Sequence, residues 1–293
     1  MTKKLGIFII IFLAVGFINP VYAIKIGLYT NVESVKLGSS TNAAIISAQT
    51  NKTIYTLDSM RNYEFKAYNS DNITIKIGGK YYKLNTNEIT INPQNNGFVS
   101  SKNRWYRGIF ILKNRNGLLT LINKLDIESY IKGVVPAEMP PSWGYEALKA
   151  QAIAARSYAL ANLGKRNSFG YDLKDTPEDQ AYNGASAETD NTNKAVKDSY
   201  GIVLIYDLKI IPAYYSASAG GHTVDAGDVW EKNLPYIRSV PSYDSNIKKN
   251  GHGVGMSQHG ANNLAKQGYN AYQILHYFYK DIKFAKINQD FYK

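Results

Sequence analysis

The sequence contains no cysteine, and it has only 9 prolines, 4 methionines and 3 tryptophans among 293 residues. The absence of cysteine excludes disulfide bonds, thiolate catalysis and thiolate metal ligands together. Acidic residues are also few: 23 Asp and Glu stand against 34 Lys and Arg, which gives a formal net charge of +11. The fold must therefore depend on packing, and the protein should be attracted to polyanions.

Only one long hydrophobic run is present, from Leu5 to Ile18. It follows Lys3-Lys4 and precedes Asn19-Pro20 and Val21-Tyr22-Ala23. This is the layout of a signal peptide, and the run is shorter than the roughly 20 residues of a spanning helix. We predict that residues 1–23 are a signal peptide cleaved after Ala23, with a retained membrane anchor as the alternative. In both cases the rest of the chain is expected outside the cytoplasm, in the cell wall or on the outer face of the membrane.

The basic residues occur in ones and twos, as in Lys165-Arg166 and Lys248-Lys249, without a zinc-finger or RNP-type signature. No nucleic acid partner is therefore expected. The 24 tyrosines suit carbohydrate, because each offers a flat apolar face with a polar tip. The composition favours an anionic wall polysaccharide as the partner.

Residues 24–104 are predicted to form a β-rich region, because short β-type runs alternate with Asn, Gly and Ser. The Gly78-Gly79 pair before Lys80–Leu84 indicates a hairpin with a tight turn. The predicted strands here and just beyond are Ile24–Tyr29, Ala43–Ala48, Thr53–Leu57, Tyr63–Tyr68, Ile73–Ile77 and Tyr106–Leu112.

The hydrophobic period changes after Leu125, and Glu138 is expected in a Pro-rich turn between Pro136 and Pro140. An alanine-rich helix is predicted from a cap at Ser142 to Gly164. Because its side chains are small, other elements can approach it closely, and it is expected to lie at the centre of its neighbours. Strands follow at Ile202–Tyr206 and Ile210–Ser216, then a glycine-rich turn and a helix that stops at Gly268. A capping box of Asn270 and Gln273 starts a last helix through Tyr279. The fold class is α+β: a β-rich N-terminal region joined to a mixed α/β catalytic core, residues 105–293, with an Ala-rich central helix.

Three segments are too particular to be generic scaffold: residues 125–140 (LDIESYIKGVVPAEMP) with 147–159 (ALKAQAIAARSYA), residues 214–223 (YYSASAGGHT), and residues 251–261 (GHGVGMSQHGA). Together and in this order, they resemble the stage II sporulation protein D family, whose other branch is the amidase enhancers. The resemblance covers roughly Trp105 to Lys280. It implies a lytic transglycosylase that acts on peptidoglycan glycan strands stripped of stem peptides by a partner amidase, with Glu138 as the essential acid.

The residues around Glu138 support that role independently. Glu138 is the only acid between Ser129 and Tyr145, and its sequence neighbours are mostly apolar. Burial of those neighbours would raise the pKa of the carboxyl, as a general acid requires. Ordinary glycosidases need a second carboxylate. A lytic transglycosylase does not, because the 6-hydroxyl of N-acetylmuramic acid attacks C1 and closes a 1,6-anhydro ring.

The glycine-rich segments suit a glycan cleft, because residues without side chains let backbone donors approach sugar hydroxyls. The predicted substrate contacts are Tyr214, Tyr215, Ser216, Ser218, Gly220, Gly221, His252 and Gln258. A serine hydrolase built on Ser218 is disfavoured, because no Gly-x-Ser-x-Gly elbow surrounds it.

No metal and no cofactor is predicted. The four histidines, His222, His252, His259 and His276, form no His-Glu-x-x-His motif. Some relatives that the chain resembles carry a zinc-linked cysteine pair, but Lys174 and Asp179 stand at those positions here.

A non-enzymatic alternative stays open: a glycan-binding enhancer that stimulates a partner cell-wall amidase. Fold and function are separable, so the resemblance alone does not decide between them. The chain also passes from Asp244 to Gly251 in a few residues, where longer members insert a segment.

Overall fold

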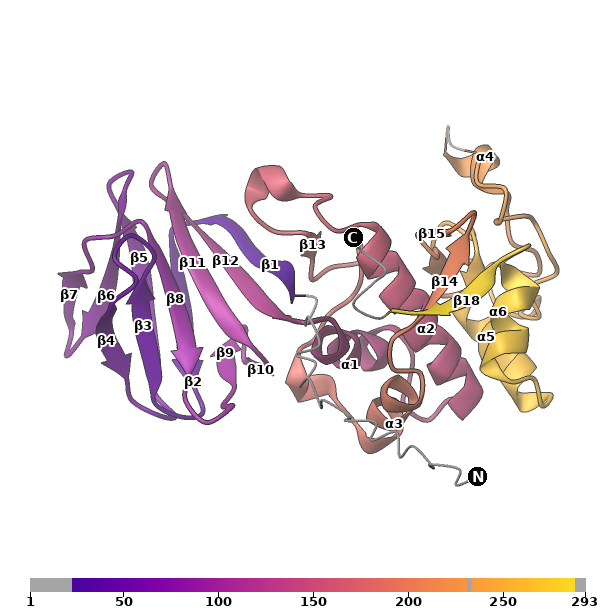
Figure 1. Cartoon of the computed structure of the whole chain (residues 1–293), viewed down its shortest axis with the longest axis horizontal. Coiled ribbons are helices and arrows are strands. Elements are labelled where there is room, and N and C mark those ends of the chain that lie inside the picture. The colour runs from indigo at the N-terminus through magenta and orange to yellow at the C-terminus, as the bar shows by residue number, and fades with distance from the viewer. Residues whose placement is uncertain (1–22, 231–232, 288–293) are drawn as a thin grey trace, which may run out of the picture.

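The structure, a computed structural model, describes residues 23–230 and 233–287. A β-sheet region forms one end of the molecule, and helices with short strands form the other (Figure 1). The predicted leader, residues 1–23, lies outside the described residues except for Ala23. Within the described ranges, no helix is long and apolar enough to cross a membrane.

Two mainly antiparallel sheets pack against each other in the N-terminal half (Figure 1). The seven-stranded sheet has the order β13 (Leu173–Lys174), β1 (Ala23–Val32), β12 (Leu118–Asp126), β11 (Ile109–Arg115), β8 (Glu88–Pro93), β3 (Ala43–Ser47) and β4 (Thr53–Leu57). The six-stranded sheet has the order β10 (Arg104–Tyr106), β9 (Val99–Ser101), β2 (Ser34–Ser39), β5 (Asn62–Tyr68), β6 (Asn72–Ile77) and β7 (Lys80–Lys83).

The strands form because apolar side chains alternate along them. Ile89 and Ile91 of β8 are fully buried, as are Phe110 and Leu112 of β11, while the residues between them are only half-buried. Such alternation places one face of each strand in the core between the sheets. The hairpin predicted at Gly78-Gly79 is confirmed, because both glycines adopt positive φ between β6 and β7.

The sheets extend further along the chain than residue 104. Strands β11 and β12 lie in the same sheet as β1 and run to Asp126. The predicted strand Tyr106–Leu112 is wrong as one element, because β10 ends at Tyr106 and β11 begins at Ile109 in the other sheet. Gly108, with φ of +76°, makes the change of direction between them.

Helices α1 (Ile127–Glu138) and α2 (Tyr145–Ala161) occupy the centre of the molecule, between the sheets and the C-terminal elements (Figure 1). The remaining helices are α3 (Asp190–Asp198), α4 (Ala226–Val229), α5 (Gln258–Lys266) and α6 (Ala271–Phe278), with 3₁₀ turns at Asn167–Phe169 and Ala185–Ala187.

The Ala-rich helix α2 is buried along nearly its whole length and contacts α1, α3, α5, α6 and β14. The predicted central helix is therefore confirmed. The Ser142 cap is wrong: the N-cap residue is Gly144, which makes no side-chain cap. The N–H of Gly144 itself donates to the Asn262 Oδ1 of α5 at 2.9 Å, which joins the start of α2 to α5.

Helix α1 was not predicted from the sequence, because Pro136 and Pro140 suggested a turn. The helix begins at the cap residue Asp126, whose carboxylate accepts from the Ser129 N–H at 2.9 Å. Glu128 then pairs with the fully buried Arg156 of α2 through two bonds of 2.7 Å. This buried, two-pronged pair fixes α1 against α2, and α1 ends at Glu138.

The C-terminal elements include a three-stranded sheet of β15 (Lys209–Ile210), β14 (Ile202–Tyr206) and β18 (Lys283–Lys286), and a parallel pair of β16 (Tyr215–Ser216) and β17 (Met256–Ser257). The predicted strand Ile210–Ser216 is wrong, because its two ends belong to these different sheets. The capping box of Asn270 and Gln273 at the start of α6 is confirmed.

Candidate active site

A hollow of about 650 Å³ brings together segments that are far apart in the sequence. Glu138 comes from the end of α1, and residues 177–179 and Ala181 come from a loop between β13 and α3. Residues 214–217, 251–252 and Gln258 come from the other two motif segments, and Asn250 directly precedes the last of them. All three segments singled out in the sequence therefore contribute to one cleft.

Glu138 lies in this cleft, and each of its carboxyl oxygens accepts a hydrogen bond. The Ala181 N–H donates to Oε1 at 2.7 Å, and the Gln258 side-chain amide donates to Oε2 at 3.2 Å. Burial raises the pKa of Glu138 above its usual value, although the bonds from Ala181, Gln258 and Tyr215 oppose this shift. The net direction is that of a carboxyl adapted to hold a proton.

Four of the predicted contact residues line the cleft: Tyr214, Tyr215, Ser216 and His252. Tyr214 packs against Trp230, with 4.5 Å between the ring centroids, and Trp230 packs against His252 at 5.1 Å. Burial and nearby Lys249 lower the pKa of His252, so the imidazole is neutral at pH 7. These rings form an aromatic wall that suits the apolar face of a sugar.

Gln258 also lines the cleft, where it contacts Glu138 directly. Ser257 caps α5 by accepting from the Gly260 N–H at 3.0 Å, and this cap sets where the helix begins. Gln258 is therefore a partner of the carboxyl as well as a candidate for substrate contact.

Ser218, Gly220 and Gly221 do not line the cleft. The Ser218 hydroxyl is buried and donates to the Lys248 carbonyl at 2.7 Å. The Gly221 N–H donates to Asp244 at 2.9 Å, and the glycines serve the turn, with φ of +75° at Gly220 and +112° at Gly221. Their roles are structural because the loop turns away from the cleft behind Ser216.

Several residues in or directly behind the cleft were not among the predicted substrate contacts. Gln180 donates to the Tyr215 hydroxyl at 2.8 Å and accepts from the Tyr130 hydroxyl at 3.2 Å. Tyr158 and Trp230 line the cleft from α2 and from the segment after α4. Only the spatial arrangement of the loop reveals them, because backbone donors such as Ala181 leave no mark in a sequence.

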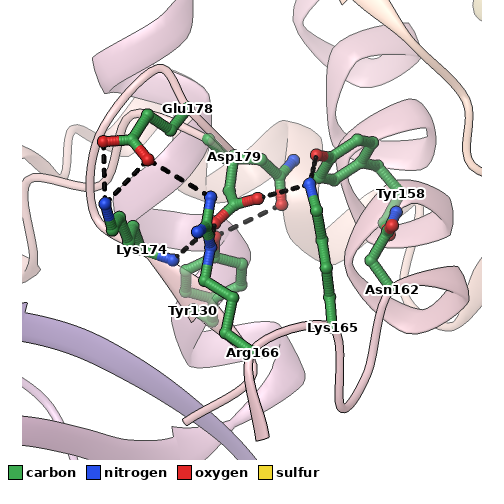
Figure 2. Close-up of polar contacts among 9 residues, drawn as sticks. Tyr130, Tyr158, Asn162, Lys165, Arg166, Lys174, Glu178 and Asp179 are labelled. Carbon is green, nitrogen blue, oxygen red and sulfur yellow. Dashed lines mark hydrogen bonds and ion pairs between the residues drawn. The ribbon is translucent and has the colours of Figure 1, made fainter. Parts of the chain in front are cut away.

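The loop that carries Gln180 and Ala181 is fixed by ion pairs (Figure 2). Asp179 is fully buried at its side chain and accepts from Lys165 at 2.6 Å and Arg166 at 2.5 Å. Glu178 pairs with Lys174 at 2.7 Å. Burial alone would raise the pKa of Asp179, but the bonds from Arg166, Lys165 and the Lys174 N–H lower it.

This ion-pair cluster stands where the family resemblance places a zinc-linked cysteine pair. The Lys174 N–H donates to the Asp179 carboxylate at 2.8 Å, so these two positions still contact each other. Strand β13 also joins the loop to β1 of the sheet, with Leu173 beside Ile26. Gly27 of β1 allows this approach, because a Cβ there would lie 2.7 Å from the Tyr171 ring. Among the described residues, no group of three or more His, Cys, Asp or Glu is placed to hold a metal ion.

The structure thus defines a mixed α+β protein with a polar, aromatic-walled cleft around one partly buried carboxyl. Comparison with known proteins places it further. Residues 115–206, which include Glu138 and Ala181, match the family model described as Stage II sporulation protein. The chain therefore contains a region of the stage II sporulation protein family, and its relatives include proteins named stage II sporulation protein D and amidase enhancer.

Three curated relatives illustrate the similarity. An amidase enhancer of Bacillus subtilis (strain 168) is 45% identical over 107 residues, 36% of this chain and 14% of the relative. Stage II sporulation protein D of Bacillus amyloliquefaciens is 34% identical over 136 residues, 41% of this chain and 40% of the relative. An uncharacterised protein of Brachyspira hyodysenteriae (strain ATCC 49526 / WA1) is 33% identical over 184 residues, 60% of this chain and 50% of the relative. The chain spans half or less of the length of these relatives.

Proposed function

We propose that the chain is a lytic transglycosylase that cleaves peptidoglycan glycan strands without stem peptides and leaves 1,6-anhydro-N-acetylmuramic acid ends. One observation carries the proposal. Three carboxylates line the cleft, but Glu178 and Asp179 are held in ion pairs, whereas Glu138 forms none among the described residues. A cleft with one available carboxyl fits a reaction that needs one acid and no activated water.

The chemistry requires Glu138 to act twice. It first donates its proton to the glycosidic oxygen, and the bond from that oxygen to C1 of N-acetylmuramic acid breaks. The 6-hydroxyl oxygen of the same sugar then bonds to C1, and its proton returns to Glu138. The carboxyl ends as it began, no water is consumed, and the two products together have the mass of the substrate.

The hydrogen bonds around Glu138 suit both steps. The Ala181 N–H stabilises the ionised form after the first proton transfer. Gln258 can rotate its amide, so its carbonyl oxygen can accept a hydrogen bond when Oε2 carries the proton. The raised pKa keeps a larger protonated fraction than an exposed Glu would have.

The rest of the cleft is suited to sugar. Tyr214, Trp230 and His252 supply a wall of rings. Ser216 lines the cleft, and its buried hydroxyl has no hydrogen-bond partner among the described residues. The proposal also requires export, because peptidoglycan lies outside the membrane, and the leader predicted at residues 1–23 would supply it.

The test is digestion of peptide-free glycan strands by the wild type, by Glu138→Gln and by a matched control, Glu33→Gln. Glu33 is an exposed carboxylate of the sheet region. Glu138→Gln should lose about 10²–10⁴-fold of the cleavage rate, the usual contribution of general acid catalysis, while it still binds glycan. Glu33→Gln should cleave like the wild type. Equal rates for all three proteins would refute the role of Glu138.

A non-catalytic enhancer is the second candidate, favoured by the 45% identity to a protein named amidase enhancer. It would bind glycan through the same cleft and stimulate a partner cell-wall amidase. If no protein cleaves glycan, and the wild type and Glu138→Gln stimulate an amidase equally, the enhancer replaces the enzyme.

A further inference from the structure

Outside the cleft, the outer face of the six-stranded sheet carries two adjoining hollows of about 330 and 470 Å³. Both are lined by Lys36, Arg61 and Asn62, so they form one continuous groove. Neither hollow includes a residue of the family match at 115–206. The proposed transglycosylase therefore gives this face no role.

One row of residues crosses the groove directly from strand to strand. Trp105 of β10 stands opposite Ser100 of β9, Ser100 opposite Gly38 of β2, and Gly38 opposite Asn62 of β5. Four strands about 4.8 Å apart make this row about 14 Å long. It has an aromatic ring at one end and hydroxyl and amide groups along it, which are the groups that bind sugars.

Gly38 forms the floor of the row. A Cβ there would lie 2.5 Å from Asn62 Oδ1 and 2.8 Å from Ser100 Oγ. Because the glycine has no side chain, the Ser100 hydroxyl and the Asn62 amide can meet above it, at 3.4 Å. Any larger residue would lift these two polar groups out of the groove.

The groove is basic. Five cationic side chains line the two hollows, with Glu64 as the one acidic side chain: Lys36, Arg61, Lys76, Lys102 and Arg104. Lys102 pairs with Asp175 at 2.6 Å, Arg61 with Asp58 at 3.1 Å and Lys76 with Glu64 at 3.7 Å, but Lys36 and Arg104 form no ion pair within the described ranges. The groove therefore keeps an excess of positive charge.

A second aromatic ring lies beyond Lys76 on the neighbouring strand. Tyr81 of β7 stands opposite Lys76, and the ammonium groups of Lys66 and Lys76 lie 5.0 and 5.5 Å from its ring centroid. Its side chain is 41% exposed. The groove thus has an aromatic residue at each end, Trp105 and Tyr81.

We infer that this groove binds an anionic polysaccharide, a chain of sugar rings that carry phosphate or carboxylate groups, and so holds the protein on the wall independently of the catalytic cleft. The rings and polar row contact the sugars, and Lys36, Lys76 and Arg104 contact the anions. Carboxylates of peptide-free glycan and phosphates of a phosphodiester-linked wall polymer are the two sources of this chemistry.

The experiment measures binding of the full chain, carrying Glu138→Gln to prevent cleavage, to a phosphodiester-linked wall polysaccharide, to peptide-free glycan strands and to neutral dextran. The test variant is Lys36→Gln with Lys76→Gln, two exposed lysines. The matched control is Lys209→Gln with Lys283→Gln, two exposed lysines of the three-stranded sheet with the same change of charge.

The test variant should bind at least one of the two anionic polymers roughly tenfold more weakly, because each exposed charge contact is worth a few-fold in affinity. The polymer whose binding weakens shows whether the groove binds glycan carboxylates or the phosphates of a phosphodiester-linked polysaccharide. Dextran should bind weakly to every variant, and binding of the anionic polymer should weaken as salt is added. Equal affinities for test and control variants on both polymers would overturn the proposal.

Trp105 distinguishes sugar recognition from charge attraction alone. Trp105→Ala should weaken binding of the affected polysaccharide, Trp105→Phe should restore most of it, and binding of double-stranded DNA should change in neither. If Trp105→Ala leaves the polysaccharide affinity unchanged, and the lysine variant weakens polysaccharide and DNA binding equally, the groove is a general polyanion surface and the polysaccharide site is overturned. Because no arm depends on cleavage, this outcome is separate from the fate of the transglycosylase proposal.

Discussion

Asp244 is predicted to hold the two glycine-rich segments in place around the cleft. Its carboxylate is fully buried and accepts from the Ala219 N–H at 2.7 Å, the Gly221 N–H at 2.9 Å and the Ser257 hydroxyl at 2.6 Å, as well as from Ser242. Ser257 caps the helix that begins with Gln258, and Gln258 contacts Glu138. Asp244 therefore helps to position the Glu138 carboxyl through Ser257 and Gln258.

Asp244→Asn preserves the shape but replaces one acceptor oxygen by an amide donor. Whichever way the amide turns, two of the four bonds are lost, and an N–H group faces a backbone N–H. Hydrogen bonds to a charged group are worth about 1.5–3 kcal/mol each, so the variant should lose roughly 3–6 kcal/mol of unfolding free energy. For a chain of this size that corresponds to a melting temperature lower by roughly 5–10 °C.

The assay is urea or thermal unfolding beside Asp207→Asn, an exposed aspartate in the turn between β14 and β15 that should change stability little. The bonds lower the pKa of Asp244 in the folded protein, even though burial opposes them. Its stabilisation is therefore present above the unfolded pKa, about 3.9, and is lost as pH falls through the folded pKa. The deficit of Asp244→Asn should shrink toward low pH. A deficit below about 1 kcal/mol at pH 7, or one independent of pH, would refute the reasoning.

Three further predictions follow from the same structure. Because burial raises the pKa of Glu138, ionisation costs folding free energy above its unfolded pKa, so Glu138→Gln should be more stable than the wild type at pH 7 and gain less at pH 4; equal gains at both pH values in urea unfolding would contradict this. Chelator should leave melting temperature and activity unchanged, whereas Asp179→Asn should lower both because it leaves Lys165 and Arg166 without their buried partner; the opposite pattern would show a metal site. Residues 1–23 fused to a reporter should place it outside the membrane, and N-terminal sequencing of the mature chain should begin at Ile24; a reporter kept in the cytoplasm would contradict export.

The fold could be predicted from the sequence wherever a single local signal decided the structure. The Gly78-Gly79 hairpin, the strand Ile202–Tyr206 and the Asn270 capping box each depend on a few adjacent residues, and the structure confirms them. Helix α1 was missed because Pro136 within it and Pro140 just beyond it suggested a turn, while its position is fixed by the distant partner Arg156. Ser142 failed as a cap because α2 begins later, after Gly144, whose N–H donates to Asn262 of another helix.

The candidate site divides in the same way. The segments that meet at the cleft were visible in the sequence, because Glu138, Tyr214 and His252 lie in unusual patterns. The hydrogen-bond partners of Glu138 were harder to predict from the sequence. Ala181 contributes a backbone N–H that any residue could offer, and Gln180 is placed by a loop whose ion pairs join residues up to 14 positions apart. Contacts of this kind depend on the completed fold.

The central claim is that Glu138 drives an internal attack without water, and the products of cleavage in oxygen-18 water test it most directly. Peptide-free glycan strands are digested with the wild type, and the new ends are analysed by mass spectrometry. The account predicts anhydro ends, lighter by one water than reducing ends, with no heavy oxygen incorporated. Reducing ends that each carry one heavy oxygen would contradict it, because a water-activating group would then have to accompany Glu138.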